Sequence, residues 1–164
     1  MGLGALLGRI LLATIFILNG IHKIQNPGQS ASYLSDNYRK FYDWMMFDVK
    51  LSDLVGPHVP DQVMPKSISA HSTQIILYTG YFEVGVGVLM ILGSGFAGFL
   101  AGNFIFLTTA IFHNPFLGKD KAEYLQNTYQ LILNLAIAGG CFLVGDSHLF
   151  GRKSAGARTG DASG

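Results

Sequence analysis

Residues 73–92 read TQIILYTGYFEVGVGVLMIL, a run of apolar and uncharged side chains that one carboxylate, Glu83, interrupts. The run is long enough for a helix across the hydrocarbon core of a bilayer, which is roughly 30 Å thick and needs about 20 residues. A carboxylate in hydrocarbon costs at least a few kcal/mol unless it is paired, protonated or in contact with water. The stretch therefore predicts a membrane-spanning helix in which Glu83 has a specific partner.

Three further stretches have the same apolar character, and they lie at 3–22, 95–112 and 128–145. Between the second and third of the four stretches, residues 93–95 read GSG, which predicts a tight antiparallel turn. Charged residues make up 13% of the 164-residue chain, about half of their share in soluble domains. We therefore predict an all-α membrane protein, a four-transmembrane-helix bundle with both termini on one side.

The connection between the first two spans is too long for a bare loop. Within residues 31–50, apolar side chains recur at spacings of three and four, which predicts an amphipathic helix. Its tyrosines and Trp44 are typical of a helix lying at the membrane interface, and the alternative, which is compatible with the first, is a helix packed over the mouth of the bundle. We expect one membrane domain at 1–150, followed by a polar, disordered tail at 151–164.

Arg9 is the other charged residue that falls well inside a predicted span. In antiparallel spans, Arg9 lies about 5 Å from the middle of its helix, and Glu83 is displaced from the middle toward the same side. We therefore predict a buried polar pair between Arg9 and Glu83. The pair either fixes the register of the helices, or lines a polar cavity that holds an anionic or carbonyl group or relays a proton.

A second group of polar residues lies at the membrane face away from the termini. His22, His71, His113 and Asn114 stand at the ends of three spans, so the topology brings them to one candidate ligand-binding mouth. Histidines there can bind a transition metal or donate a hydrogen bond to a quinone carbonyl. No two of them have the spacing of a local metal motif, so we predict neither a metal site nor a catalytic centre. If the mouth binds a ligand, quinone is the cofactor that we consider for it; the alternative is that these are the polar residues that span ends at a membrane interface normally contain.

Small residues and two asparagines predict close contacts between the spans. Residues 4–8 read GALLG and residues 98–102 read GFLAG, and both have the small-xxx-small spacing that lets helix backbones approach closely. Asn103 and Asn134 lie inside spans, where we expect their amides to form hydrogen bonds across helices.

The four spans together resemble the DoxX family of small four-span membrane proteins. The similarity lies in GRILLATIFILNGIHKI at 8–24 and YFEVGVGVLMILG at 81–93. It implies that Arg9 and Glu83 are the embedded polar pair, in a membrane component associated with quinone-linked sulfur oxidation or redox-stress assemblies. The chain departs from the family in its long first connection, and GDSHLFGRK at 145–153 matches the family's end only loosely.

Three hypotheses of function follow. The first is a non-catalytic accessory subunit of a larger membrane complex, such as a respiratory complex, with lipids and other membrane-protein subunits as partners. The alternatives are a quinone-interacting membrane oxidoreductase subunit and a transporter of small solutes or protons. We expect the mitochondrial inner membrane or a bacterial plasma membrane as the location. The net charge of +1, without a basic run, argues against nucleic-acid binding.

Overall fold

The computed structural model describes residues 3–55 and 58–149, so the predicted tail at 151–164 lies outside the described residues. These residues form helices and contain no strand, which confirms the all-α prediction for the part described. The α-helices are α1 (Leu3–Gln25), α2 (Pro27–Asp43), α3 (Leu51–Val55), α4 (Pro65–Ala70), α5 (Ser72–Ile91), α6 (Gly95–Phe112) and α7 (Lys121–Leu149). Three short elements are a π-helix η1 (Trp44–Asp48) and two 3₁₀ turns, η2 (Asp61–Val63) and η3 (Pro115–Leu117).

Four of these helices, α1, α5, α6 and α7, are long and apolar enough to cross a membrane. They occur where the sequence predicted spans, but α7 begins at Lys121 and not near residue 128. The earlier start has a local cause, because the Asp120 side chain accepts a hydrogen bond from the Glu123 N–H and Glu123 accepts one from the Lys119 N–H. This arrangement resembles a capping box, except that the return bond goes to the residue before the N-cap, and it satisfies N–H groups at a helix start and so extends α7 beyond its apolar part.

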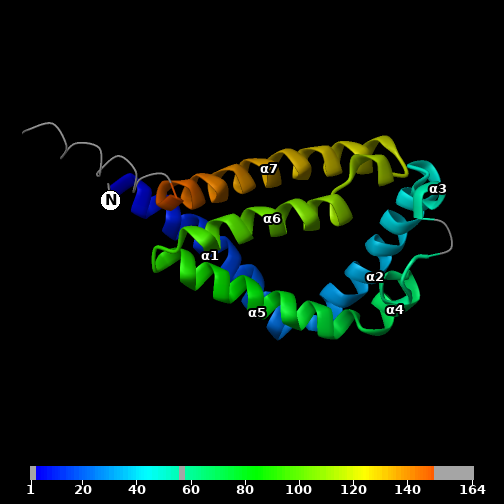
Figure 1. Cartoon of the computed structure of the whole chain (residues 1–164), viewed down its shortest axis with the longest axis horizontal. Coiled ribbons are helices and arrows are strands. Elements are labelled where there is room, and N and C mark those ends of the chain that lie inside the picture. The colour runs from blue at the N-terminus through cyan, green and yellow to red at the C-terminus, as the bar shows by residue number, and fades with distance from the viewer. Residues whose placement is uncertain (1–2, 56–57, 150–164) are drawn as a thin grey trace, which may run out of the picture.

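The four long helices lie as two antiparallel pairs, α1 with α5 and α6 with α7 (Figure 1). The pairs come together near the turn between α5 and α6 and diverge toward the other end, where α2 crosses from one pair to the other (Figure 1). The predicted four-transmembrane-helix bundle is therefore not confirmed. The N-terminal end of α1 and the C-terminal end of α7 lie at the same end of the molecule, as an even number of spans requires (Figure 1).

Glycines bring the two helices of each pair into backbone contact. A Cβ placed on Gly20 in α1 would lie 2.6 Å from the carbonyl oxygen of Gly80 in α5, and one placed on Gly98 in α6 would lie 2.6 Å from the carbonyl oxygen of Cys141 in α7. The GFLAG motif at 98–102 thus makes the close approach that its spacing predicts. The GALLG motif at 4–8 does not, because neither of its glycines has a described atom within 4 Å of an added Cβ.

The helix expected within 31–50 is α2, and it begins earlier, with Pro27 at its first turn. Proline suits that position because its missing N–H would have no helical partner there. Ala31 and Leu34 are buried against Ile76 of α5. Farther along α2, Lys40 lies 3.4 Å from Glu123 of α7. These contacts are those of a helix packed over the mouth between the two pairs, the alternative that the sequence left open.

Candidate functional site

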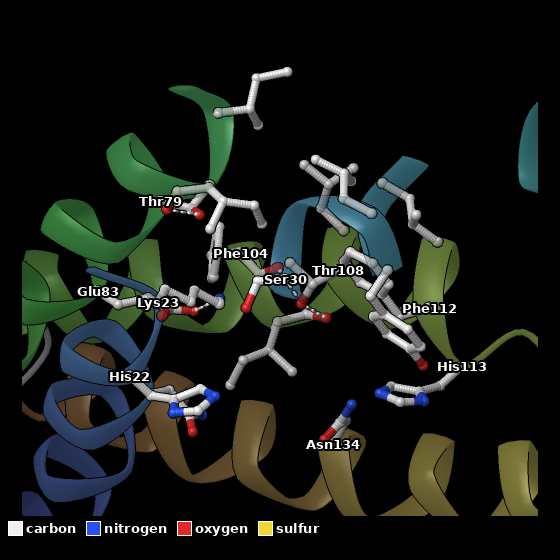
Figure 2. Close-up of a pocket in the computed structure, with 18 of the residues that line it drawn as sticks. His22, Lys23, Ser30, Thr79, Glu83, Phe104, Thr108, Phe112, His113 and Asn134 are labelled. Carbon is white, nitrogen blue, oxygen red and sulfur yellow. Dashed lines mark hydrogen bonds and ion pairs between the residues drawn. The ribbon is translucent and has the colours of Figure 1, made fainter. Parts of the chain in front are cut away.

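A cavity of about 790 Å³ lies between the two helix pairs and beside α2. This volume is within the roughly 300–1,000 Å³ of typical small-molecule sites. Side chains from α1, α2, α5, α6 and α7 line it, and most of the lining surface is apolar. Its apolar wall includes Ile15, Phe16, Ile76, Phe104, Ile105 and Ile137, and its polar groups include His22, Lys23, Glu83, Thr108, His113 and Asn134 (Figure 2).

An ion pair between Lys23 and Glu83 is the strongest polar feature of the cavity. The Lys23 Nζ donates a hydrogen bond of 2.6 Å to the Glu83 Oε1 (Figure 2). The Lys23 side chain is 23% exposed and that of Glu83 is 6% exposed, so the lysine side chain is the more accessible member. The same ammonium lies 5.6 Å from the centre of the Phe104 ring, a cation–π geometry that adds to its stabilisation.

The register between α1 and α5 explains why Lys23 is the partner. Gly20 and Gly80 face each other, and the Cβ of Lys23 lies 3.3 Å from the place of an added Cβ on Gly80, one turn before Glu83. Helical side chains lean toward the N-terminus of their own helix. Because α1 and α5 are antiparallel, the side chains of Lys23 and Glu83 lean toward one another and meet.

The predicted Arg9–Glu83 pair is thus replaced by Lys23–Glu83. Arg9 is buried, with 2% of its surface exposed, but its Nη1 lies 3.4 Å from the place of an added Cβ on Gly93, in the turn after α5. Both side chains lean toward the N-termini of their helices, and in antiparallel helices these directions carry Arg9 and Glu83 apart. The prediction compared depths alone and did not include this lean.

The four residues of the predicted mouth separate into two that line the cavity and two that do not. His22 and His113 line it from opposite sides (Figure 2). His71 lies exposed at the junction of α4 and α5, with its Nδ1 2.9 Å from the Ser67 carbonyl oxygen. Asn114 is buried, and its side chain accepts a hydrogen bond from the Phe116 N–H at the start of η3. Among the described residues, no group of three His, Cys, Asp or Glu side chains is placed to hold a metal ion.

Of the two asparagines inside the spans, Asn134 lines the cavity and Asn103 is not among its lining residues. Asn134 of α7 donates a 3.0 Å hydrogen bond to the hydroxyl of Thr109 in α6, a buried residue, and also lines the cavity. The Asn103 amide bonds instead to the Phe99 carbonyl one turn back in its own helix. Only the first of the two therefore links helices as predicted.

Lys23 is the functional candidate that the sequence reasoning missed. It stands just beyond the predicted span at 3–22, where lysines commonly reach water. Its spacing of three from Gly20 was a usable signal, because a glycine at a helix contact lets the residue one turn later approach the neighbouring helix. That signal becomes specific only when the partner glycine, Gly80, is known.

The helices and the cavity define a multi-pass α-helical membrane protein with a polar pair at the wall of an apolar chamber. The chain belongs to the family described as HR-like lesion-inducing, whose family model matches residues 1–145. Searches of curated proteins and of solved structures returned no match.

The family match corrects the resemblance to DoxX, because the matching model is that of a different family. The residues that carried the resemblance are glycines, apolar side chains and two buried charges. Packed membrane helices of many kinds require these features, so they were weak markers of one family. The respiratory complex and the two membranes named as locations drew on that resemblance, and neither the structure nor the comparisons support them.

Proposed function

We propose that this protein binds a small amphipathic molecule within the membrane, in the cavity between its two helix pairs. The observation that carries the proposal is the Lys23–Glu83 ion pair at the wall of an otherwise apolar chamber of about 790 Å³. Charged residues inside spans are costly and commonly mark ligand or ion sites. In this proposal the two pairs and α2 form a single four-span domain.

The cavity combines a charged pair with a mostly apolar lining, as an amphipathic ligand requires. Lys23 and Glu83 stand at one edge (Figure 2), and the apolar lining includes Ile105 and Ile137. On α2, Tyr33 lines the cavity and its ring stacks on that of Phe112 in α6 at a centroid distance of 5.3 Å. The head group of the ligand would lie near the ion pair, and α2 would cover it.

A cavity-filling substitution tests this proposal. Thr108→Phe places a ring in the cavity, whereas Ala110→Phe adds the same ring to an exposed position of α6 that does not line it. We expect native mass spectrometry from mild detergent to find a small molecule retained by the natural protein and by Ala110→Phe, but not by Thr108→Phe. Equal retention by the two variants would remove the cavity as the binding site.

A second candidate is the predicted role as accessory subunit of a larger membrane complex. It is favoured by large apolar side chains on the segment between α2 and α4, where Phe47 is 73% exposed and Leu54 is 83% exposed. Exposed apolar side chains outside the spans suit contact with another subunit or with lipid. Purification from native membranes in mild detergent would test it, since a protein that runs as a monomer without partners contradicts a stable complex.

The remaining two hypotheses are less well matched to the geometry. A quinone has carbonyl oxygens that Lys23 can bind, and it would use the same cavity, but electron transfer would need a redox partner that this chain does not suggest. Transport would need access from both membrane faces. Most of the lining residues belong to the α2-side halves of α1, α5 and α6, and those of α7 lie near the middle of that helix, which suits a binding site better than a path across the membrane.

A further inference from the structure

The residues that line the cavity have a net charge close to zero, and this limits the kind of head group that the cavity can hold. Of the residues that line the cavity, Lys23, Glu83 and Asp36 carry a charge when the histidines are neutral. Lys23 and Glu83 neutralise one another at 2.6 Å. Asp36 is exposed on α2, where water screens its charge.

A charged head group would disturb this balance. An anion would compete with Glu83 for Lys23 and would leave an uncompensated negative charge in a mostly apolar chamber. A cation would compete with the Lys23 ammonium for Glu83, whose side chain is 6% exposed against 23% for Lys23, and would leave that ammonium uncompensated. Both arrangements carry the cost of an unpaired charge inside a membrane protein, which an uncharged head group avoids.

The hydrogen-bonding groups of the ion pair further limit which uncharged head group the cavity can hold. A lysine ammonium has three N–H donors, and Glu83 takes one of them through its Oε1. The Glu83 Oε2 is buried and accepts no hydrogen bond among the described residues. The pair thus has both a donor and an acceptor left over at neighbouring positions. A hydroxyl group matches both, because its oxygen accepts a hydrogen bond while its proton is donated.

We infer that the ligand of this cavity is an uncharged alcohol with a long apolar tail. Its hydroxyl oxygen accepts a hydrogen bond from the Lys23 Nζ, and its hydroxyl proton is donated to the Glu83 Oε2. That oxygen is covered in the present arrangement, so the carboxylate turns toward the cavity as the hydroxyl enters. The tail lies along the apolar wall that includes Ile105 and Ile137. This inference rests on the proposed function and specifies the chemistry of its ligand.

Photoreactive probes that share one tail and differ in the head group test the inference. Each probe is a twelve-carbon chain with a mid-chain diazirine, and the heads are a hydroxyl, a methyl ketone, a carboxylate and an ammonium. The full chain is labelled in phosphatidylcholine nanodiscs, and adducts are mapped by peptide mass spectrometry. We expect the alcohol to label peptides from α1, α5 and α6 that line the cavity, and excess 1-dodecanol to compete.

The ketone accepts a hydrogen bond from Lys23 but donates none, so it isolates the contribution of Glu83. One hydrogen bond to a charged group predicts about tenfold weaker cavity labelling by the ketone than by the alcohol. Lys23→Met and Glu83→Gln should each weaken labelling by the alcohol about tenfold for the same reason. Lys66→Met removes a lysine of α4 that does not line the cavity, and labelling should be unchanged.

The outcomes separate this inference from the proposed function. Suppose that 1-dodecanol competes with labelling of the cavity, but the carboxylate, ammonium or ketone probe labels it as strongly as the alcohol probe or more strongly. The inference of an alcohol ligand is then wrong, whereas the proposal of an amphipathic ligand stands. If no probe labels the cavity peptides in a competable manner, the proposed function itself fails. The comparison among probes uses the natural chain, so it remains decisive even where a substituted protein does not fold.

Discussion

The glycine contact between α1 and α5 allows a strict test of the register that brings Lys23 to Glu83. In Gly20→Ala the new methyl group would lie 2.6 Å from the Gly80 carbonyl oxygen and 3.0 Å from the Val84 nitrogen. Both atoms belong to the backbone, so no side-chain rotation relieves the clash. The methyl group would also meet a Val84 methyl at 2.8 Å. The two helices must therefore move apart.

The size of the effect follows from these distances. Bringing the shortest contact from 2.6 Å to an ordinary 3.4 Å requires a separation of 0.8 Å, in an interface whose contact extends to Gly87 against Ile17. Overpacking a well-packed contact costs about 1–3 kcal/mol. Alanine also gains up to about 1 kcal/mol over glycine as a helix former. The matched control Gly8→Ala has the same intrinsic gain in helix propensity. Apart from the nearby backbone of its own helix, no described atom lies within 4 Å of its added methyl group.

The difference between the two variants therefore isolates the helix contact. We expect Gly20→Ala to unfold with a free energy about 1–3 kcal/mol below that of Gly8→Ala. Reversible unfolding by SDS in mixed micelles, followed by far-ultraviolet circular dichroism, measures both. If the two alanine variants are equally stable within about 0.5 kcal/mol, the backbone contact between α1 and α5 is wrong, and with it the register that places Lys23 beside Glu83.

Three further predictions concern contacts outside that interface. Asn134→Leu should lose about 0.6 kcal/mol, and at most about 1.7, with its bond to α6, whereas Asn103→Leu should cost less in the same SDS titration because its bond lies within its own helix. A double-mutant cycle on Lys40 and Glu123 should give a coupling below about 1 kcal/mol that falls with added salt, since both side chains are about one third exposed. A larger coupling that is insensitive to salt would contradict an exposed pair. The pKa of Tyr38 is raised above its ordinary value of 10.0, mainly by burial and to a smaller extent by the phenol of Tyr42, one turn along α2. The resulting stabilisation is present below that value and is lost as the pH rises through the folded-state pKa, so the natural protein should lose more stability between about pH 9 and 11 than Tyr38→Phe does.

Much of the helical structure was predictable from the sequence because helix formation in a membrane depends on local composition. An apolar run of about 20 residues must satisfy its backbone hydrogen bonds internally, and a helix does so without reference to the rest of the chain. The positions of α1, α5 and α6 followed from this rule. The start of α7 did not, because the capping hydrogen bonds of Asp120 and Glu123 lie in polar sequence, where hydropathy gives no signal.

The arrangement of the helices was less predictable, because it depends on which faces meet. Small-xxx-small motifs occurred in two spans, at 4–8 and 98–102, yet only the second lies at a described helix contact. The contact between α1 and α5 uses Gly20, Gly80 and Gly87, which do not form one motif within a single helix. A glycine shows that a close approach is sterically allowed, but the choice among such glycines depends on the summed packing of both helices.

The site depends both on local composition and on which helix faces meet. For this reason Glu83 could be predicted from the sequence as a buried charge, but its partner could not. Hydropathy locates a charge along the membrane normal, and Arg9 and Glu83 matched by that measure. The partner is decided by the direction in which each side chain leans and by the register of the glycine contacts. With Gly20 opposite Gly80, Lys23 is directed toward Glu83, and Arg9 is directed toward the turn at Gly93. A lysine at the end of one span is thereby placed at the wall of the cavity, where its charge is neutralised and its remaining donors can meet a ligand.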